Sequence, residues 1–251
     1  MFEVEGVAYK EKLVIPQAYH AGMTADIVKH WGNYSFPHPP HHSQLIEAAE
    51  SHHFGAFGLY DMINIADRLG PEELAKLFVA EVSADTTNPN TRIMILHHNL
   101  RVMTPMLKKT SPENPLLSVY TAIEAMYDEQ LARSTITPEE LRYVDGVMCA
   151  ADKISFDFCA QKQTPRSVSI GSYGQQEQPV ALNYQILPDR NIHVYPWPFQ
   201  NPKISGILTA FPKNGYPQNL LERRRIPYTV SPGNPDIWNA VNSIDTSNGY
   251  K

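Results

Sequence analysis

Cysteine is scarce in this chain, and so are long apolar runs and any excess of positive charge. The two cysteines, Cys149 and Cys159, fall in one expected helix. Their spacing there places them about 15 Å apart, beyond the reach of a disulfide. No apolar stretch approaches the roughly 18 residues that a membrane-spanning helix needs. We therefore expect a reduced protein that does not span a membrane.

The net charge and the first residues of the chain narrow its expected partners and cellular location. The chain carries 21 Lys and Arg against 26 Asp and Glu, a net charge of −5. Nucleic acids and anionic membranes select for basic surfaces, so we expect neither as a partner and favour a small-molecule substrate. Residues 1–6 contain neither the basic nor the apolar part of a signal peptide, so we expect a cytoplasmic location. These features leave the oligomeric state open.

The residue pattern changes near position 162. Before it, apolar residues recur at helical spacing; after it, short β-branched and aromatic runs alternate with turn residues, and residues 230–251 are expected to be irregular. We therefore expect a mainly α protein, with a helical core over residues 1–162 and a β-containing C-terminal extension over residues 163–251 packed on it. The expected helices span residues 17–30, 43–53, 60–69, 71–83, 91–106, 115–132 and 138–160, and the expected strands span residues 12–16, 167–170, 180–186, 192–195 and 204–211.

Histidine is concentrated at one end of the chain. Nine of the ten histidines fall within the first 98 residues, and four of them form the adjacent pairs His52-His53 and His97-His98. Imidazole is the commonest side-chain metal ligand and also carries protons near neutral pH. Four of the expected helices each present one or two ligand-type side chains: His20 on the first, the two histidine pairs on the second and the fifth, and Asp152 on the last. This arrangement predicts a transition metal held between helices, with iron favoured and manganese, zinc or cobalt also compatible.

The segments around these residues resemble the HD superfamily of metal-dependent proteins. Residues 48–55 (Ala-Ala-Glu-Ser-His-His-Phe-Gly) resemble its helix that ends His-Asp, and residues 151–155 (Ala-Asp-Lys-Ile-Ser) resemble its late Ala-Asp-Lys-Leu segment. His20 resembles its first ligand. Residues 95–99, which contain the second histidine pair, are similar to the middle histidine pair of members with two or more metals. The resemblance implies an HD-type helical bundle.

A closer likeness is to an uncharacterised bacterial family of HD-like proteins. It joins Trp-Gly-Asn, here residues 31–33, to Asp-x-x-Ser-x-x-x-Cys, here Asp152, Ser155 and Cys159. A Pro-x-Pro-Phe corner matches residues 196–199. Together these elements cover residues 12 to 212.

One departure bears directly on the metal. The superfamily has aspartate where this chain has His53. That aspartate bridges two ions with its two oxygens, whereas an imidazole carries its nitrogens on opposite ring edges. The replacement favours one metal, or two metals joined by other groups.

The resemblance assigns roles to individual residues. It implies that the metal ligands are His20, His52, His53, His97 and Asp152. Catalytic roles fall to His53, His98 and Arg101. The simpler alternatives are a helix cap for the first histidine pair, buried or surface histidines for the others, and a solvated helix residue for Asp152. His38, His41 and His42, in a proline-rich loop, are expected on the surface. Cys159 is expected to be a buried structural thiol.

Three functions fit these features. The first is an iron-dependent oxygenase or oxidoreductase acting on a small organic substrate, favoured by histidine-rich ligation and by the aromatic residues Trp31, Phe54, Phe57 and Tyr60. The second is a metal-dependent phosphohydrolase, in which Arg101 and Lys153 neutralise phosphate charge. The third is a non-catalytic metal-binding protein. A metal-dependent enzyme is the prediction carried forward.

Overall fold

The computed structural model describes residues 2–5, 12–52, 88–107, 115–174, 176, 178–214, 216, 218–235 and 238. The helices of this part are α1 (Gln17–Lys29), α2 (His42–Ser51), α6 (Pro89–Leu107), α7 (Pro115–Leu131) and α8 (Pro138–Cys159). The strands are β1 (Phe2–Glu5), β2 (Lys12–Ile15), β3 (Arg166–Ile170), β4 (Val180–Ile186), β5 (Asn191–Tyr195), β6 (Ile204–Pro212) and β7 (Arg224–Pro232).

The strands form one seven-stranded sheet in the order β1-β2-β6-β7-β5-β4-β3. Neighbouring strands are antiparallel except β5 and β7, which are parallel. The sheet takes strands from both ends of the chain, because β2 pairs with β6 through Leu13 with Pro212 and Val14 with Phe211. Strands on both sides of the expected boundary near residue 162 therefore share one sheet.

The expectation of a mainly α, all-helical-core fold is wrong. The chain is α/β, and a mixed sheet forms one of its layers rather than an appendage. The strands after residue 162 were expected, but two others were not. Strand β1 was not foreseen, and β7 begins with charged arginines and falls partly in the region expected to be irregular. The continuity of the sheet depends on β7, since this strand joins β6 to β5.

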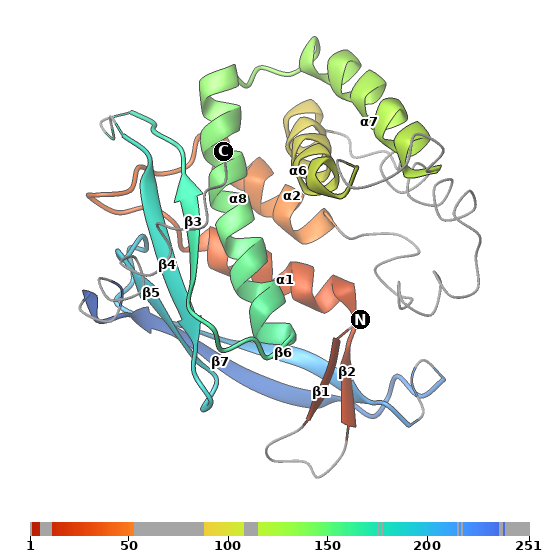
Figure 1. Ribbon diagram of the computed structural model, residues 1–251, viewed down its shortest axis with the longest axis vertical. Coiled ribbons are helices and arrows are strands. Elements are labelled where there is room, and N and C mark those ends of the chain that lie inside the picture. The colour runs from red at the N-terminus through yellow and green to blue at the C-terminus, as the bar shows by residue number, and fades with distance from the viewer. Residues whose placement is uncertain are drawn as a thin grey trace.

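Helices α1 and α8 lie side by side over one face of the curled sheet, as Figure 1 shows, and both contact its strands. Helix α2 packs on α1, and α6 packs on α2, α7 and α8. A single apolar cluster runs through both layers, from Ile27 of α1 and Val147 of α8 to Ile192 of β5 and Val230 of β7. The shared core fixes α1 and α8 relative to each other.

Helix α8 shows how the sequence specifies its elements. Thr137 is the N-cap: its side chain accepts from the backbone N–H of Glu140, whose carboxylate accepts from the backbone N–H of Thr137. Pro138 occupies the first turn, where its missing N–H costs nothing. The hydrogen bonds from Thr137 lower the pKa of Glu140. The expected start of this helix is confirmed.

The other expected helices are confirmed where the structure describes them: α1, α2, α6 and α7 lie close to their expected bounds. The helices expected over residues 60–69 and 71–83 lie outside the described residues. Among the described helices, none combines the length and the apolar character needed to cross a membrane.

Asp157, on α8, joins that helix to the sheet. Its carboxylate accepts a hydrogen bond from the Tyr184 hydroxyl of β4 at 2.6 Å. Lys162 and Arg166 each place a nitrogen 3.3 Å from it. Asp157 is buried, whereas both cations are partly exposed. The pKa of Tyr184 is raised by burial and by its carboxylate partner, which keeps the hydroxyl protonated as the donor.

Gly206 of β6 makes room for the ring of Tyr228 on β7. A Cβ atom at this position would overlap that ring, which is buried and held by a hydrogen bond from its hydroxyl to Asp26. Gly206→Ala is therefore expected to lower the free energy of unfolding by about 2 kcal/mol, a typical cost of overpacking. Chemical denaturation monitored by circular dichroism measures the change.

The matched control is Gly22→Ala on α1, where an added Cβ would meet no atom within 4 Å. Alanine there is expected to raise stability by about 0.5–1 kcal/mol, because glycine is a poor helix former. Equal effects of the two substitutions would contradict the overlap at Gly206.

Candidate metal centre

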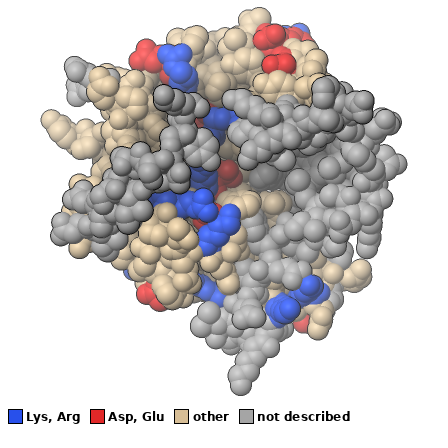
Figure 2. Space-filling view, viewed as in Figure 1, with Lys and Arg blue, Asp and Glu red and all other residues tan. Residues whose placement is uncertain are grey.

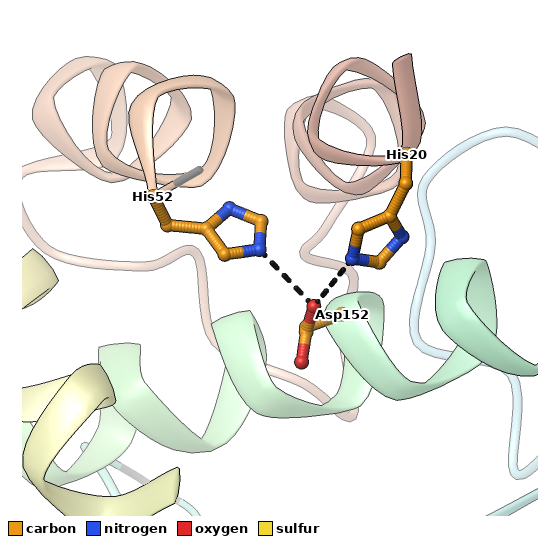
Figure 3. Close-up of side chains that lie close together, drawn as sticks. All are labelled: His20, His52 and Asp152. Carbon is orange, nitrogen blue, oxygen red and sulfur yellow. Dashed lines mark hydrogen bonds and ion pairs between the residues drawn. The ribbon is translucent and has the colours of Figure 1, made fainter. Parts of the chain in front are cut away.

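Three side chains from three helices meet at one point, shown in Figure 3. His20 lies in the first turns of α1, His52 follows the last turn of α2, and Asp152 lies on α8. The Nε2 atom of His20 is 2.9 Å from Oδ1 of Asp152, and the Nε2 atom of His52 is 3.1 Å from the same oxygen. One nitrogen or oxygen of each residue lies within 4.8 Å of the other two.

Helix packing explains why these residues converge. Helix α1 contacts both α2 and α8, so the face of α1 that carries His20 is enclosed by the other two helices. His20 is fully buried and His52 almost so, while the side chain of Asp152 is 16% exposed. The cluster is therefore shielded on the histidine side and reaches solvent on the carboxylate side.

The Nδ1 atoms of His20 and His52, on the ring side away from Asp152, each have a hydrogen-bond partner. Nδ1 of His52 donates to the backbone carbonyl of Ala49 at 2.6 Å, since a carbonyl can only accept. Nδ1 of His20 lies 2.8 Å from the hydroxyl of Ser155. Ser155 can donate its own proton to the carbonyl of Asp152 at 2.9 Å, which leaves its oxygen able to accept from His20. Thr24, 2.7 Å from the Ser155 hydroxyl, completes this buried network.

These bonds prepare both rings to bind a cation. A neutral imidazole with its proton on Nδ1 carries a lone pair on Nε2. In that tautomer the Nε2 atoms of His20 and His52 are the ligand atoms for a cation beside Oδ1 of Asp152. The carboxylate oxygen would be the third of these ligand atoms. Their separations match the roughly 3 Å between adjacent ligands of an ion with bonds of about 2.1 Å.

The charge states of His20 and Asp152 suit metal binding. Burial lowers the pKa of His20, and this outweighs the opposing effect of Asp152, which favours the neutral ring. Burial alone would raise the pKa of Asp152, but hydrogen bonds with His20 and His52 hold that pKa well below its usual range. A neutral imidazole and an ionised carboxylate are forms that ligate transition metals.

The second histidine pair divides between two environments. His98 is buried, its Nε2 atom lies 3.7 Å from Oδ2 of Asp152, and its ring packs edge-on against that of His52 at 5.3 Å between centroids. His97 was expected to be the ligand, yet its Nδ1 atom lies 3.3 Å from the Tyr127 hydroxyl and its Nε2 atom 3.8 Å from Asp145. The structure thus brings His98, rather than His97, to the cluster.

Arg101, whose side chain is partly exposed, is held by groups beside the cluster. Its Nε atom lies 2.6 Å from Oδ2 of Asp145, its Nη2 atom lies 3.1 Å from Nδ1 of His98, and its Nη1 atom contacts the Cys149 sulfur. Asp145 is buried, so it balances the positive charge of Arg101 at close range. The guanidinium is therefore already paired with a carboxylate of this chain.

Sequence reasoning missed Asp145, although a signal for it was present. Asp145 precedes Asp152 by two helical turns in the segment that was expected to be a helix, so both carboxylates lie on one face. Burial would raise the pKa of Asp145, but its neighbours His98, Arg101 and His97 lower it. Asp145 is the carboxylate that links the second histidine pair to Arg101.

His53, expected to be a ligand and a catalytic residue, lies outside the described residues, and so do Phe54, Phe57 and Tyr60. Trp31 packs in the core against Phe36 and Phe199 instead of lining the cluster. The described aromatic side chain next to the cluster is Phe156, whose ring meets that of His20 edge-on at 6.1 Å between centroids.

The loop histidines contact residues outside the cluster. His38 bonds Gln200, His41 bonds Asn90, and His42 bonds the carbonyl of Val28. Cys159 is fully buried, as expected, and burial raises the pKa of its thiol well above the usual value. A thiol in this state is a poor nucleophile.

Two motifs distant in the sequence meet in the fold. The backbone N–H of Gly32 donates to the carbonyl of Pro198 at 2.9 Å, and the Asn33 amide donates to the carbonyl of Trp197 at 2.7 Å. Gly32 has φ 115°, a conformation that favours glycine. Residues 31–33 and 196–199 therefore have a structural role, tying the end of α1 to the corner after β5.

Comparisons of this chain with protein-family models, with curated proteins and with solved structures find no match.

Proposed function

We propose that this chain is a metal-dependent enzyme, with iron as the preferred metal, that oxidises a small organic substrate. The observation that carries the proposal is the pair of histidines that place their Nε2 atoms at one oxygen of the Asp152 carboxylate while their Nδ1 atoms contact other groups of the chain. Two histidines and one carboxylate form the ligand set typical of non-haem iron(II) oxygenases. Iron bound there would supply one-electron and dioxygen chemistry, which side chains alone lack.

The residues of the chain have distinct tasks in this proposal. His20, His52 and Asp152 hold the ion, and Ser155 and the carbonyl of Ala49 orient the two rings. Burial of both histidines excludes water from their side of the site. The substrate approaches from the side of Asp152, whose side chain is the most exposed of the three.

A phosphohydrolase is the second candidate, and one observation favours it. Figure 2 shows Lys and Arg side chains gathered along the middle of the face on which Figure 1 draws α8. Phosphate esters are attracted by such charge. Arg101, however, is paired with Asp145, which weakens its expected role in neutralising phosphate. The oxygenase is therefore the better supported of the two.

Elemental analysis of freshly purified protein separates the candidates. Bound iron with an optical or paramagnetic signal that changes on exposure to oxygen supports the oxygenase. Metal-activated release of phosphate from a panel of phosphate esters supports the hydrolase. A bound metal that gives neither signal nor turnover supports a non-catalytic metal-binding protein. Failure to retain any transition metal under reducing, chelator-free conditions would contradict the metal centre itself.

His52→Ala is expected to lower the metal content of the purified protein by more than tenfold, because it removes a ligand whose ring is already oriented for binding. The ratio of metal to protein, measured by plasma emission spectroscopy, gives the result. The matched control is His41→Asn, which removes another histidine of the same region. Asparagine tolerates the left-handed backbone of residue 41, at φ 52°. Equal losses of metal in both variants would count against the assignment of His52.

A further inference from the structure

A third histidine stands beside the cluster, and its far nitrogen meets a different partner. His98 places Nε2 3.7 Å from Oδ2 of Asp152, on the carboxylate oxygen that His20 and His52 do not contact. In His20 and His52 the Nδ1 atom meets an acceptor. In His98 the Nδ1 atom meets Arg101. This difference decides which nitrogen of each ring carries the proton.

Arg101 can only donate. Its Nη2 atom lies 3.1 Å from Nδ1 of His98. A guanidinium has five N–H donors, has no acceptor and stays protonated in proteins. Burial opposes that charge, but Asp145 and Cys149 outweigh it and raise the pKa of Arg101. The contact is therefore a hydrogen bond only if Nδ1 of His98 carries the lone pair.

The other group near Nδ1 does not compete for it. Oδ1 of Asp145 lies 3.8 Å from Nδ1 of His98, beyond hydrogen-bond distance. The same oxygen is buried and has no hydrogen-bond partner within the described part of the chain. If Nδ1 of His98 carried a proton, that proton would face the guanidinium. The neutral ring therefore has its proton on Nε2.

We propose that Arg101 is a positioning residue that holds His98 with its proton on Nε2, so that His98 is a hydrogen-bond donor beside the metal and not a ligand. The inference rests on the metal centre proposed above. It deepens that proposal, because Nε2 of His98 lies beside Oδ2 of Asp152, next to the ligand atoms of the metal centre. A substrate with an acceptor oxygen, such as a carboxylate or a carbonyl group, would receive this hydrogen bond.

Three neighbours fix the orientation of Arg101. Asp145 meets Nε at 2.6 Å, the Cys149 sulfur meets Nη1, and His98 meets Nη2. The two terminal nitrogens of the planar guanidinium thus donate to separate partners, and the charge of Asp145 lies beside Nε, so turning the plane would break one of these contacts. The negative charge of Asp145 holds the guanidinium in place, and the hydrogen bond from the guanidinium decides which nitrogen of His98 carries the proton.

Nuclear magnetic resonance of the ¹⁵N-labelled full-length protein tests the inference. Long-range ¹H–¹⁵N correlations distinguish a protonated ring nitrogen from one with a lone pair, and a His98→Gln variant assigns the His98 signals. We expect His98 protonated on Nε2 in the metal-free protein. In Arg101→Met, which keeps the stem and removes the donors, we expect the proton to move toward Nδ1. Arg133→Met, which removes an exposed guanidinium paired with Glu129, is the control and should leave the spectrum of His98 unchanged.

Addition of Zn²⁺ completes the experiment. In the wild type, the Nε2 signals of His20 and His52 should shift as ligands, while His98 keeps its Nε2 proton. In Arg101→Met, His98 should join the histidines that shift. A wild-type His98 with its proton on Nδ1, or one whose Nε2 binds Zn²⁺, overturns the inference, and the wild type alone decides this if Arg101→Met does not fold. Zn²⁺ that shifts neither His20 nor His52 overturns the metal centre instead.

Discussion

Asp152→Asn is expected to abolish retention of the metal while leaving the metal-free protein as stable as the wild type. The carboxylate is the shared neighbour of His20 and His52 and the only anionic group among the described residues of the cluster. Losing an outer partner of a ligand already costs about 10–100-fold in metal affinity, and losing the charged ligand itself should cost more. Titration with Zn²⁺ against a competing chelator measures the change.

The stability of the metal-free variant gives the more informative half of this prediction. In the wild type, one oxygen of Asp152 is shared by the Nε2 atoms of His20 and His52. An asparagine amide offers an acceptor oxygen and a donor nitrogen to the two rings, so contacts with both remain available. The melting temperature should therefore stay close to that of the wild type.

Asp128→Asn, on the exposed side of α7, is the matched control for the loss of one negative charge. A large drop in the melting temperature of metal-free Asp152→Asn, absent from this control, would mean that the carboxylate holds the helices together by itself. That result would favour protonated histidines paired with Asp152 over a metal site.

Asp157→Ala is expected to lower stability by removing a contact between α8 and β4. Its carboxylate receives the Tyr184 hydroxyl at 2.6 Å and faces both Lys162 and Arg166 at 3.3 Å. Removing it leaves the buried hydroxyl unpaired, while the two cations, which are partly exposed, regain water. We expect a loss of about 2–3 kcal/mol in the free energy of unfolding, dominated by the hydrogen bond to a charged acceptor. Urea denaturation measures this difference.

Tyr184→Phe provides the comparison for Asp157→Ala. It removes the same hydrogen bond but keeps the carboxylate with its two cations, so about 1–2 kcal/mol should be lost. The double variant should lose less than the sum of the two single variants, because both remove one shared interaction. Strict additivity would show that the helix and the sheet are joined by other contacts.

Local signals in the sequence were sufficient to predict the helices that the structure describes. Helical spacing and helix starts such as Thr137 with Glu140 depend on residues a few positions apart, and the structure confirms them. The sheet depends on pairings between distant residues, which periodicity does not report. Strand β7 also begins with Arg224 and Arg225, which resemble a solvated surface in a single sequence. The fold was therefore mistaken for a bundle with an appendage.

The same limit applies to the candidate site. His20, His52 and Asp152 could be proposed because each stands in a recognisable helix segment, and the fold brings them together. The choice between His97 and His98 depends on a rotation of about 100° along α6, finer than a sequence pattern resolves. The partners of Arg101 come from α8 and follow only from packing.

The pairing of β2 with β6 has a consequence for how the protein is made. Val14 pairs with Glu3 on one side, but its partner on the other side is Phe211, so a ribosome that adds about 5–20 residues per second leaves this second edge of β2 unpaired for roughly 10–40 s. Helices α1, α2 and α8, which carry the three converging side chains, leave the ribosome during that interval. A newly made chain thus has the parts of its metal centre before the sheet that supports them has closed.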